Sequence, residues 1–576
     1  MTRTSGVPNL DFFGETFSGI EFRAIDDQNN IAILSRNTGR GTILNSKPLQ
    51  ITPGATYRFD ITDDGNNTYL GETQINAGTI RVKHINALGS LVGVSSKGTV
   101  VADGATLEFA VANQTLTEKL TLNGQGLGGV GALRMSDDSG SSTIWSGAIS
   151  LAGTAAIGVD SGNTLTISSV ISPSTVAPTA KGLTKVGLGR LVLNAANTYT
   201  GPTTINAGEL TINGNQPKSA IVLNGGTLSG KGTILGVTSG TVAGSHINPV
   251  ANGLGKLLLK GKLALNSTTT YDVQIGGVNF GIQFDNIDVT GTVTLNGATL
   301  SPTIVNNFAS TVGNKYQILT NDKTDAIVGT FVGLAEGASR TVNGAKFQIT
   351  YKGGTGNDVV LTHVNTNSAF SHRSVTPVID EGGIATLQGT IVEADPHDRF
   401  TLTINWGDGH REIKQFPAGS GGQLVTLTHR YLEGSAQPYD IALDWRDQHG
   451  GGKSDHLSVQ VNSVAPSADI SGPDTVVPGT QNRFQFQATD STPIDQFGAM
   501  QWTIDWGDGS SISTSRRGNF SLSHVFKEPG DYIIRATARD NDGATSPIVI
   551  HRVHAEPIGG MASLLPQTLG ELLMLV

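Results

Sequence analysis

The feature that most constrains the fold is a twelve-residue phrase that occurs twice, 130 positions apart. It reads NTYLGETQINAG at Asn67–Gly78 and NTYTGPTTINAG at Asn197–Gly208, and nine of the twelve positions are identical. Repetition of this kind is typical of chains built from recurring structural units. A second repeat follows, because WGDG occurs at Trp406–Gly409 and again at Trp506–Gly509. Two repeat systems predict an array of modules rather than one enzyme domain.

The composition favours an all-β chain of several domains. A length of 576 residues exceeds one hydrophobic core, so two to four domains are expected. The chain contains 75 glycines, and short alternations of apolar and polar residues are separated by Gly and Asn, as in strands that end in turns. There is no cysteine, which excludes thiol chemistry, cysteine-ligated zinc and iron–sulfur clusters.

The charge distribution excludes a nucleic-acid surface. Residues 1–363 carry 24 Lys/Arg against 23 Asp/Glu, whereas residues 364–554 carry 14 against 22, and neither part has the basic stripe that nucleic acid requires. The sequence contains no run of 18 apolar residues, so it predicts no membrane-spanning helix. The first residues lack the apolar core of a signal peptide, so we expect a piece of a larger exported protein or a misplaced start.

Residues 1–363 share one local pattern. Segments such as Gly208–Gly214 (GELTING) and Gly291–Gly297 (GTVTLNG) alternate apolar residues with Thr and end in Asn-Gly. The alternation predicts half-buried strands, and Asn-Gly predicts a turn after each. Hairpins of antiparallel sandwiches and coils of a parallel solenoid both fit. The long repeat favours the solenoid, with roughly 20 or more residues per coil and Thr and Asn stacked in ladders.

A family resemblance supports the solenoid. The string GLTKVGLGRLVLN at Gly182–Asn194, followed by the second copy of the phrase, resembles the autotransporter-associated β-strand repeat. That repeat is found in passenger domains of bacterial autotransporters and in giant surface proteins, including those of planctomycete-like bacteria. The resemblance implies an exported right-handed parallel β-helix over residues 1–363. Residues 265–363, richer in aromatics, are expected to form its C-terminal capping region.

A different pattern begins near residue 364. The strings FTLTINWGDG at Phe400–Gly409 and MQWTIDWGDG at Met500–Gly509 each predict a strand that runs into a tight turn. A His-containing strand and an acidic loop follow each one. These strings resemble the PKD (polycystic kidney disease) domain, an immunoglobulin-like β-sandwich. The resemblance implies a divergent copy at residues 364–463 and a fuller copy at 464–554, with 555–576 as an unassigned tail.

The WGDG motifs have a structural interpretation. We expect Asp408 and Asp508 to accept backbone N–H groups within their turns, while Trp406 and Trp506 pack in the core. His429 and His524 lie at matching places in the two modules. Because no partner within either module is evident from the sequence, they are interpreted as packing or strand-edge residues.

Two oxygen-rich segments are candidate Ca²⁺ ligands. Asp540, Asn541 and Asp542 form one, in the acidic loop of the second PKD-like module. The other is Asp358, within GGTGNDVVL at Gly353–Leu361, which matches the nonapeptide that binds Ca²⁺ in β-rolls. That chemistry needs consecutive copies and only one is present, so a turn before the last strand is the favoured interpretation of Asp358. No other cofactor is expected.

An enzyme on the solenoid is the main rival class. Parallel β-helices host pectin lyases and glycosidases, which need clustered carboxylates or a Ca²⁺ and Arg group. Residues 161–271 contain a single carboxylate, Glu209. The sequence therefore predicts a non-enzymatic exported or cell-surface protein, with a β-helical stalk presenting PKD-like modules to extracellular polysaccharide or other surface proteins. The alternative is a carbohydrate-binding accessory region of a larger secreted polysaccharide-degrading protein.

Overall fold

The computed structural model describes residues 73–85, 87–88, 98–136, 140–174, 180–251, 253–322, 325–393, 395–493, 498–557 and 559, and five short strands before residue 62. These early strands are β1 (Thr16–Phe17), β2 (Glu21–Ile25), β3 (Ile31–Arg36), β4 (Gly41–Thr42) and β5 (Arg58–Ile61). The chain divides into two units, Met1–Val364 and Asn365–Val576. The described residues are almost entirely strands, turns and loops, with a 3₁₀ turn at Leu127–Gly129. The predicted all-β class is confirmed.

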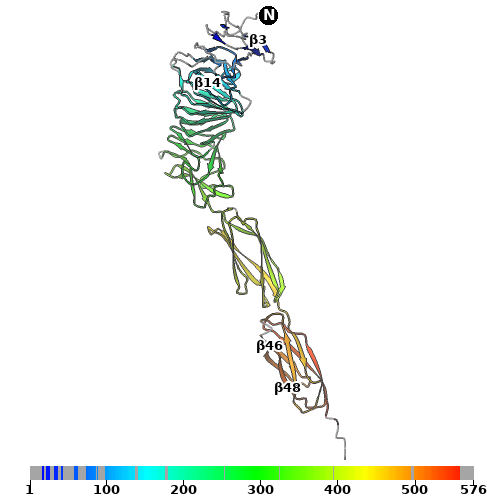
Figure 1. Cartoon of the computed structure of the whole chain (residues 1–576). Coiled ribbons are helices and arrows are strands. Elements are labelled where there is room, and N and C mark those ends of the chain that lie inside the picture. The colour runs from blue at the N-terminus through cyan, green and yellow to red at the C-terminus, as the bar shows by residue number, and fades with distance from the viewer. Residues whose placement is uncertain are drawn as a thin grey trace, which may run out of the picture. The chain divides into compact units, whose positions relative to one another are not determined.

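Most strands of the first unit belong to two sheets, which Figure 1 shows as stacked arrows around the label β14. The smaller sheet contains β10 (Thr115–Leu116), β13 (Ser142–Trp145), β15 (Thr164–Ile167), β18 (Arg190–Leu193), β20 (Glu209–Ile212), β22 (Thr227–Ser229), β24 (Ser245–Asn248), β27 (Thr269–Ile275) and β30 (Thr299–Ile304). Every neighbouring pair in this sheet is parallel.

The larger sheet contains the strands that lie between these in the sequence. From residue 73 onward they are β6 (Thr73–Ile75), β7 (Thr79–Val82), β8 (Thr99–Val101), β9 (Thr106–Phe109), β11 (Leu120–Gly124), β12 (Leu133–Met135), β14 (Ile149–Val159), β16 (Ile171–Pro173), β17 (Leu183–Val186), β19 (Thr203–Ile205), β21 (Gln216–Leu223), β23 (Thr233–Ser239), β25 (Lys256–Leu259), β26 (Leu263–Ala264), β28 (Asn286–Val289), β29 (Val293–Thr294), β31 (Lys315–Thr320), β32 (Ser339–Val342), β33 (Ala345–Gly353) and β34 (Asp358–Val364).

From β17 to β30 the chain passes back and forth between the two sheets, and we call one such passage a coil. The register shows how much sequence a coil uses: Glu209 pairs with Thr227, 18 positions later, and Thr270 with Thr299, 29 positions later. Apolar side chains of both sheets, such as Leu191 and Ile205, are fully buried in one continuous core. Each coil therefore covers the apolar edge of the coil before it.

The described part of the first copy, residues 73–78, has the same local structure as the end of the second copy. In the first copy β6 is followed by a turn with Gly78 at φ 74° and then by β7. In the second copy β19 is followed by Gly208 at φ 67° and then by β20. A side chain is strained at this backbone conformation, so the final glycine of each phrase is required by its turn. The sequence identity thus records a recurring strand–turn–strand unit.

Polar side chains connect neighbouring coils as predicted. Asn213 Nδ2 donates to Asn194 Oδ1 at 2.9 Å, 19 positions earlier, which is one rung of an asparagine ladder. Inside the stack, the hydroxyls of Thr211 and Ser229 lie 2.8 Å apart. The coils also approach closely at Gly214, where a Cβ atom would stand 1.9 Å from the Ala195 carbonyl oxygen. Only glycine fits such a contact, which explains part of the high glycine content.

The pairing changes at the end of the first unit. β28 still pairs in parallel with β31, but β31 pairs antiparallel with β34, and β32, β33 and β34 form an antiparallel meander. Aromatic rings fill this region, with Tyr316 in edge contact with Phe284 and Phe347. The last parallel strands are thereby covered by chain that runs in a different direction.

The second unit contains two copies of one strand arrangement. In the first copy a sheet of β35 (Ala369–Val375), β37 (Ile384–Val392) and β40 (Leu424–Arg430) faces a sheet of β36 (Val378–Asp380), β38 (Phe400–Asn405), β39 (Arg411–Phe416), β41 (Tyr439–Asp447) and β42 (Gly452–Asn462). The order in the larger sheet is β36-β42-β41-β38-β39. Side chains of both sheets, such as Leu387 and Leu402, share one buried core. We call this copy the first sandwich.

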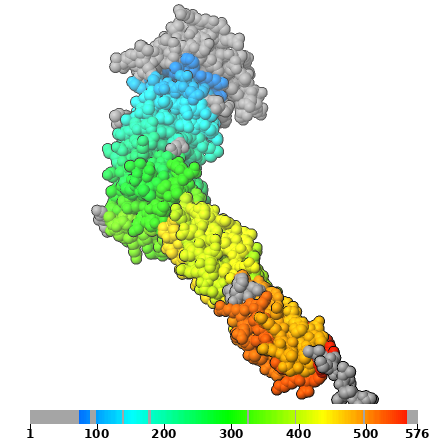
Figure 2. Space-filling model, turned by 60° about the horizontal axis from the view of Figure 1, so that its bottom comes forward, coloured from blue at the N-terminus to red at the C-terminus, as the bar shows by residue number. Residues whose placement is uncertain are grey.

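The second sandwich repeats this order strand for strand. Its sheets are β43 (Ser467–Ser471), β45 (Asn482–Thr489) and β48 (Phe520–His524), and β44 (Thr475–Val476), β46 (Ala499–Asp505), β47 (Ser511–Arg517), β49 (Gly530–Arg539) and β50 (Val549–Ala555). The larger sheet runs β44-β50-β49-β46-β47 around a core that includes Phe486 and Trp502. The residues of each sandwich gather in one lobe, yellow for the first and orange for the second (Figure 2).

A buried carboxyl group lies in the first unit beside β8. Glu118 accepts a hydrogen bond from the Thr99 hydroxyl at 2.8 Å and is almost completely covered. Burial raises its pKa to about 7, and the Thr99 hydrogen bond opposes that rise. Because the folded pKa lies above the unfolded value of about 4.3, this group favours folding most at low pH, and that contribution is lost as the pH rises through 7.

We therefore predict that Glu118→Gln makes the first unit less sensitive to pH. Between pH 4 and pH 8 the wild-type chain should lose on the order of 1–3 kcal/mol of stability that the variant keeps. Differential scanning calorimetry of both proteins across this range measures the difference. The exposed Glu528→Gln serves as control and should follow the wild type. Parallel pH curves for wild type and Glu118→Gln would contradict the prediction.

Candidate metal centre

The WGDG motifs form matching turns in the two sandwiches, and their predicted structural role is confirmed. Asp408 Oδ1 accepts the His410 N–H at 2.9 Å, and Asp508 Oδ1 accepts the Ser510 N–H at 3.0 Å. The preceding tryptophans, Trp406 and Trp506, are buried. Each aspartate therefore holds its own turn closed through the backbone.

The histidines at matching places have a partner that the sequence did not reveal. His429 Nε2 lies 2.7 Å from Asp408 Oδ2 and its ring stacks on Trp406 at 4.9 Å. In the second sandwich His524 Nε2 lies 2.7 Å from Asp508 Oδ2. The stacking agrees with the interpretation of these histidines as packing residues. The aspartate partner was not evident from the sequence, because the turn and the His strand belong to different sheets and meet only in the folded sandwich.

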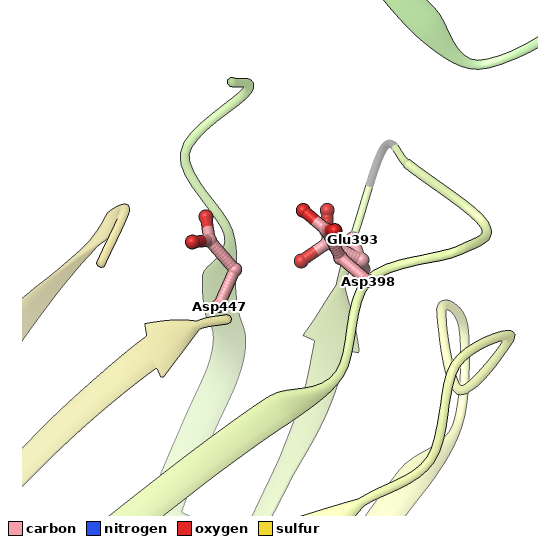
Figure 3. Close-up of side chains that lie close together, drawn as sticks. All are labelled: Glu393, Asp398 and Asp447. Carbon is pink, nitrogen blue, oxygen red and sulfur yellow. The ribbon is translucent and has the colours of Figure 1, made fainter. Parts of the chain in front are cut away.

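A cluster of carboxylates lies at one end of the first sandwich (Figure 3). Glu393 and Asp398 come from the loop between β37 and β38, and Asp447 ends β41. One oxygen from each of the three side chains lies within 4.8 Å of the others. Figure 3 shows the oxygens of Glu393 and Asp398 on one side, facing the space next to Asp447. We call this group the β37–β41 carboxylate cluster.

Asp447 is held by the backbone and by an asparagine. Its Oδ1 accepts the N–H groups of His449 and Gly451, both at 2.8 Å. Asn365 Nδ2 donates to Oδ1 at 3.2 Å and to Oδ2 at 3.0 Å. The carboxylate is 5% exposed. Its position is therefore fixed by the turn that joins β41 to β42 and by the first residue of the second unit.

Asp398 is more buried, at 2% exposed, and is only half satisfied. Its Oδ1 accepts a hydrogen bond from Gln448 Nε2 at 2.6 Å and lies 3.3 Å from His449 Nε2. Its Oδ2 is buried and has no hydrogen-bond partner. Burial raises the pKa of Asp398 above its ordinary value, the charges of Asp395 and Asp447 raise it further, and His449 opposes them.

The arrangement concentrates negative charge where water is largely excluded. Two full charges 4.8 Å apart repel by about 3–4 kcal/mol at an effective dielectric constant of about 20. In the described part of the chain neither Asp398 nor Asp447 forms an ion pair with a lysine or arginine. An oxygen-only set of this kind suits a hard cation rather than zinc, which prefers nitrogen and sulfur.

Sequence reasoning did not identify this cluster. The loop reads EADPHD from Glu393 to Asp398, and the segment DWRDQHG that contains Asp447 appeared only as an acidic loop. The two segments are about 50 positions apart and meet because β38 pairs with β41, placing Phe400 beside Asp447. The signal available in the sequence was the spacing of three acids within six residues.

The predicted Ca²⁺ ligands Asp540, Asn541 and Asp542 lie in the corresponding turn of the second sandwich. Asp540 Oδ1 accepts the N–H groups of Gly543 and Ala544, both at 2.7 Å. Burial raises the pKa of Asp540 to about 6, and the adjacent Asp542 adds to the rise. The Ca²⁺ role of this loop remains a prediction.

The loop also makes two hydrogen bonds to residues of the first sandwich. Asn541 Nδ2 donates to Glu433 Oε2 at 2.9 Å, and Asp542 Oδ2 accepts the Gly434 N–H at 2.8 Å. All three predicted ligand side chains thus already bond to chain atoms, two of them to the first sandwich.

Asp358 begins β34 and is fully buried. Its Oδ1 accepts the Asn321 N–H at 2.8 Å, and its Oδ2 accepts the N–H and the hydroxyl of Thr355 at 2.8 and 3.2 Å. Both oxygens therefore accept hydrogen bonds from the chain itself. This arrangement agrees with the favoured interpretation of Asp358 as part of a turn before the last strand.

Two family models match the chain. The passenger-associated transport repeat matches residues 64–82 and 183–212, the two places that carry the repeated phrase. The PKD domain model matches residues 463–553, the second sandwich. The resemblances drawn from the sequence are thereby confirmed at these positions.

Curated relatives are extracellular or autotransporter proteins. The chain is 30% identical over 226 residues to an extracellular serine protease of Serratia marcescens, covering 37% of this chain and 20% of the relative. It is 27% identical over 459 residues to the adhesin BmaC autotransporter of Brucella suis biovar 1, covering 71% of this chain and 12% of the relative. The chain thus spans a fifth or less of the length of these relatives.

Solved structures resemble parts of the chain. The PKD domain of an M14-like peptidase from a Thermoplasmatales archaeon is 24% identical, covers 16% of this chain and 97% of its own, and has a TM-score of 0.15. A tetra-tandem repeat from the extending region of a large adhesion protein is 16% identical, covers 39% and 59%, and has a TM-score of 0.23. At these scores neither likeness bears on function. Among the described residues no helix is long and apolar enough to cross a membrane.

We predict that Asp508→Ala destabilises the second sandwich by about 1–3 kcal/mol, because the Ser510 N–H and His524 lose their acceptor. Burial alone would raise the pKa of Asp508, but hydrogen bonds from Ser510 and His524 hold it below its ordinary value. The stabilisation is therefore present at neutral pH and lost as the pH falls below about 4. Amide hydrogen exchange of β46 and β48 measures the effect.

The control is Asp469→Ala, an exposed position on β43 of the same sandwich, which should change stability by less than about 0.5 kcal/mol. Equal exchange rates in Asp508→Ala and Asp469→Ala would show that the turn hydrogen bonds contribute nothing.

Proposed function

We propose that this chain is a non-enzymatic structural part of an exported or cell-surface protein, in which a β-helical stalk presents PKD-like modules for adhesion. The observation that carries the proposal is the repeated passage of parallel strands between two sheets, strand by strand from β17 to β24 and with two successive larger-sheet strands in each passage from there to β30. Such a stack grows by adding coils and so builds length rather than a pocket. The names of the relatives, an extracellular protease and an adhesin autotransporter, support export and surface location.

We infer that the first unit is a right-handed parallel β-helix. Parallel strands of one sheet that are joined through a crossover take the right-handed connection in nearly all proteins. The crossovers here are short passages through the second sheet, as between β18 and β20. The proposed boundaries are those of the sequence: residues 1–363 for the helix, with 265–363 as its cap, 364–463 and 464–554 for the sandwiches, and 555–576 unassigned.

We propose that the first unit has no enzyme activity, because the carboxylate in its central stretch serves a structural role. Glu209 is the single carboxylate between residues 161 and 271. Its Oε1 accepts hydrogen bonds from Thr211 at 2.9 Å and Ser229 at 2.7 Å and pairs with Arg190 at 3.2 Å. This carboxylate ties three strands together. Most glycoside hydrolases need two carboxylates flanking the scissile bond of a bound sugar, and this stretch supplies one.

The adhesion proposal predicts weak single contacts that become strong when many copies act together. Beads coated densely with the full chain should be retained on bacterial or host-cell surfaces, whereas the soluble monomer should show little binding. Bead retention under flow, compared at high and low coating density, measures this. Retention that does not depend on coating density would contradict multivalent adhesion.

The same preparation separates the alternatives. We expect no product release from pectin, alginate or casein and no retardation in gels that contain cellulose, chitin, pectin or alginate. Retardation by one polysaccharide would favour the carbohydrate-binding accessory region. Product release, abolished by Glu209→Gln, would contradict the non-enzymatic proposal altogether.

A further inference from the structure

The β37–β41 carboxylate cluster brings two buried carboxylates, Asp398 and Asp447, together with Glu393. Asp398 is 2% exposed, and its buried Oδ2 accepts no hydrogen bond. Asp398 also contributes one of three oxygens, one each from Glu393, Asp398 and Asp447, that lie within 4.8 Å of one another. A buried acceptor without a donor is costly in a folded protein unless a cation or a proton occupies the space next to it.

We propose that these three carboxylates form a Ca²⁺ site, with Asn365 as a fourth ligand residue. Ca²⁺ takes six to eight oxygen ligands at about 2.3–2.6 Å and accepts irregular geometry. Carboxylates on two loops and an amide on a third segment fit that preference. Mg²⁺ demands a regular octahedron and keeps much of its water, which suits a preformed, mostly buried set of protein oxygens less well.

The amide of Asn365 can supply a further oxygen to the cluster. Its Nδ2 donates to both oxygens of Asp447, while its Oδ1 is buried and has no hydrogen-bond partner. Rotation of the amide by half a turn exchanges the two atoms. Oδ1 then lies beside Asp447, where it would repel the carboxylate unless a cation stood between them. With Ca²⁺ present, both the orphaned Asn365 oxygen and the orphaned Asp398 oxygen become ligands.

The surroundings already hold the ligands in place. Asp398 N–H donates to the Asp395 carbonyl at 3.1 Å, and the Asp395 N–H donates to Glu393 Oε1 at 3.1 Å, so the loop is folded around its own acids. The Ser368 hydroxyl donates to the Gly451 carbonyl at 2.9 Å. Ca²⁺ would therefore bind three segments, the entry to β35, the β37–β38 loop and the β41–β42 turn, and stabilise the end of the first sandwich.

This inference differs from the adhesion proposal and does not depend on it. It also differs from the prediction for Asp540, Asn541 and Asp542. There, Asn541 and Asp542 bond to Glu433 and Gly434 of the first sandwich. Asp540 and Asp542 also each keep a buried oxygen without a hydrogen-bond partner, so the two loops are distinguished by their residues and by the experiment below. The contributions of the two loops to Ca²⁺ binding can be measured separately, because a single substitution in either loop removes a carboxylate from that loop alone.

The test uses the full chain, freed of metal with a chelator and titrated with CaCl₂ or MgCl₂ by isothermal calorimetry and thermal melting. We expect Ca²⁺ binding in the range of roughly 10⁻⁴–10⁻³ M that is typical of extracellular modules, with a rise in melting temperature. Asp398→Asn should weaken this binding at least tenfold and abolish the rise. In metal-free buffer the variant should melt no lower than the wild type, because repulsion is relieved.

The matched control is Asp444→Asn, which removes the same charge from a partly exposed position on the same strand β41 and should bind Ca²⁺ as the wild type does. Should Asp398→Asn fail to fold, Glu393→Gln gives the same comparison. The proposal is overturned by a wild-type chain without a Ca²⁺ effect, by an effect that Mg²⁺ reproduces at equal concentration, or by binding that survives Asp398→Asn and Glu393→Gln but is lost in Asp540→Asn.

Discussion

The hydrogen bond between a strand and its counterpart one coil later is the interaction on which the first unit depends. A short strand such as β22, with three residues, cannot be stable alone. It persists because Leu228 pairs with Leu210 on one side and Ile247 on the other, so that each coil buries the next. If the neighbouring coil were removed, an apolar face and a row of backbone N–H and C=O groups would be exposed together. The stability of each coil therefore depends on its neighbours along the stack.

That dependence explains the unusual composition. Where coils approach closely, as at Gly214 against Ala195, a side chain has no space, and small polar residues join the coils through hydrogen bonds such as the one between Asn213 and Asn194. Charge has little place in such a stack. Acids are denser in the sandwiches, with 22 in residues 364–554 against 23 in residues 1–363, and the candidate metal centre includes a loop between two sandwich strands.

The sequence predicted repetition, strand content and turn chemistry well, because these are local. The copies at Asn67–Gly78 and Asn197–Gly208 and the WGDG turns could be read from adjacent residues. The carboxylate cluster could not, because Glu393 and Asp447 belong to segments that meet only through the pairing of β38 with β41. The bond from His429 to Asp408 was missed for the same reason, since β40 and the turn after β38 belong to different sheets. Contacts between distant segments require the fold.

The stacking of coils is tested most directly by a disulfide, since the natural chain contains no cysteine to interfere. Thr211 and Ser229 are register partners in β20 and β22, with hydroxyls 2.8 Å apart, and parallel neighbours lie close enough for a disulfide to form. The variant Thr211→Cys/Ser229→Cys should oxidise to an intramolecular disulfide under mild conditions, whereas Thr211→Cys/Thr238→Cys should not. Failure of the first pair to link, or equal linking of both, would contradict a stack of parallel coils.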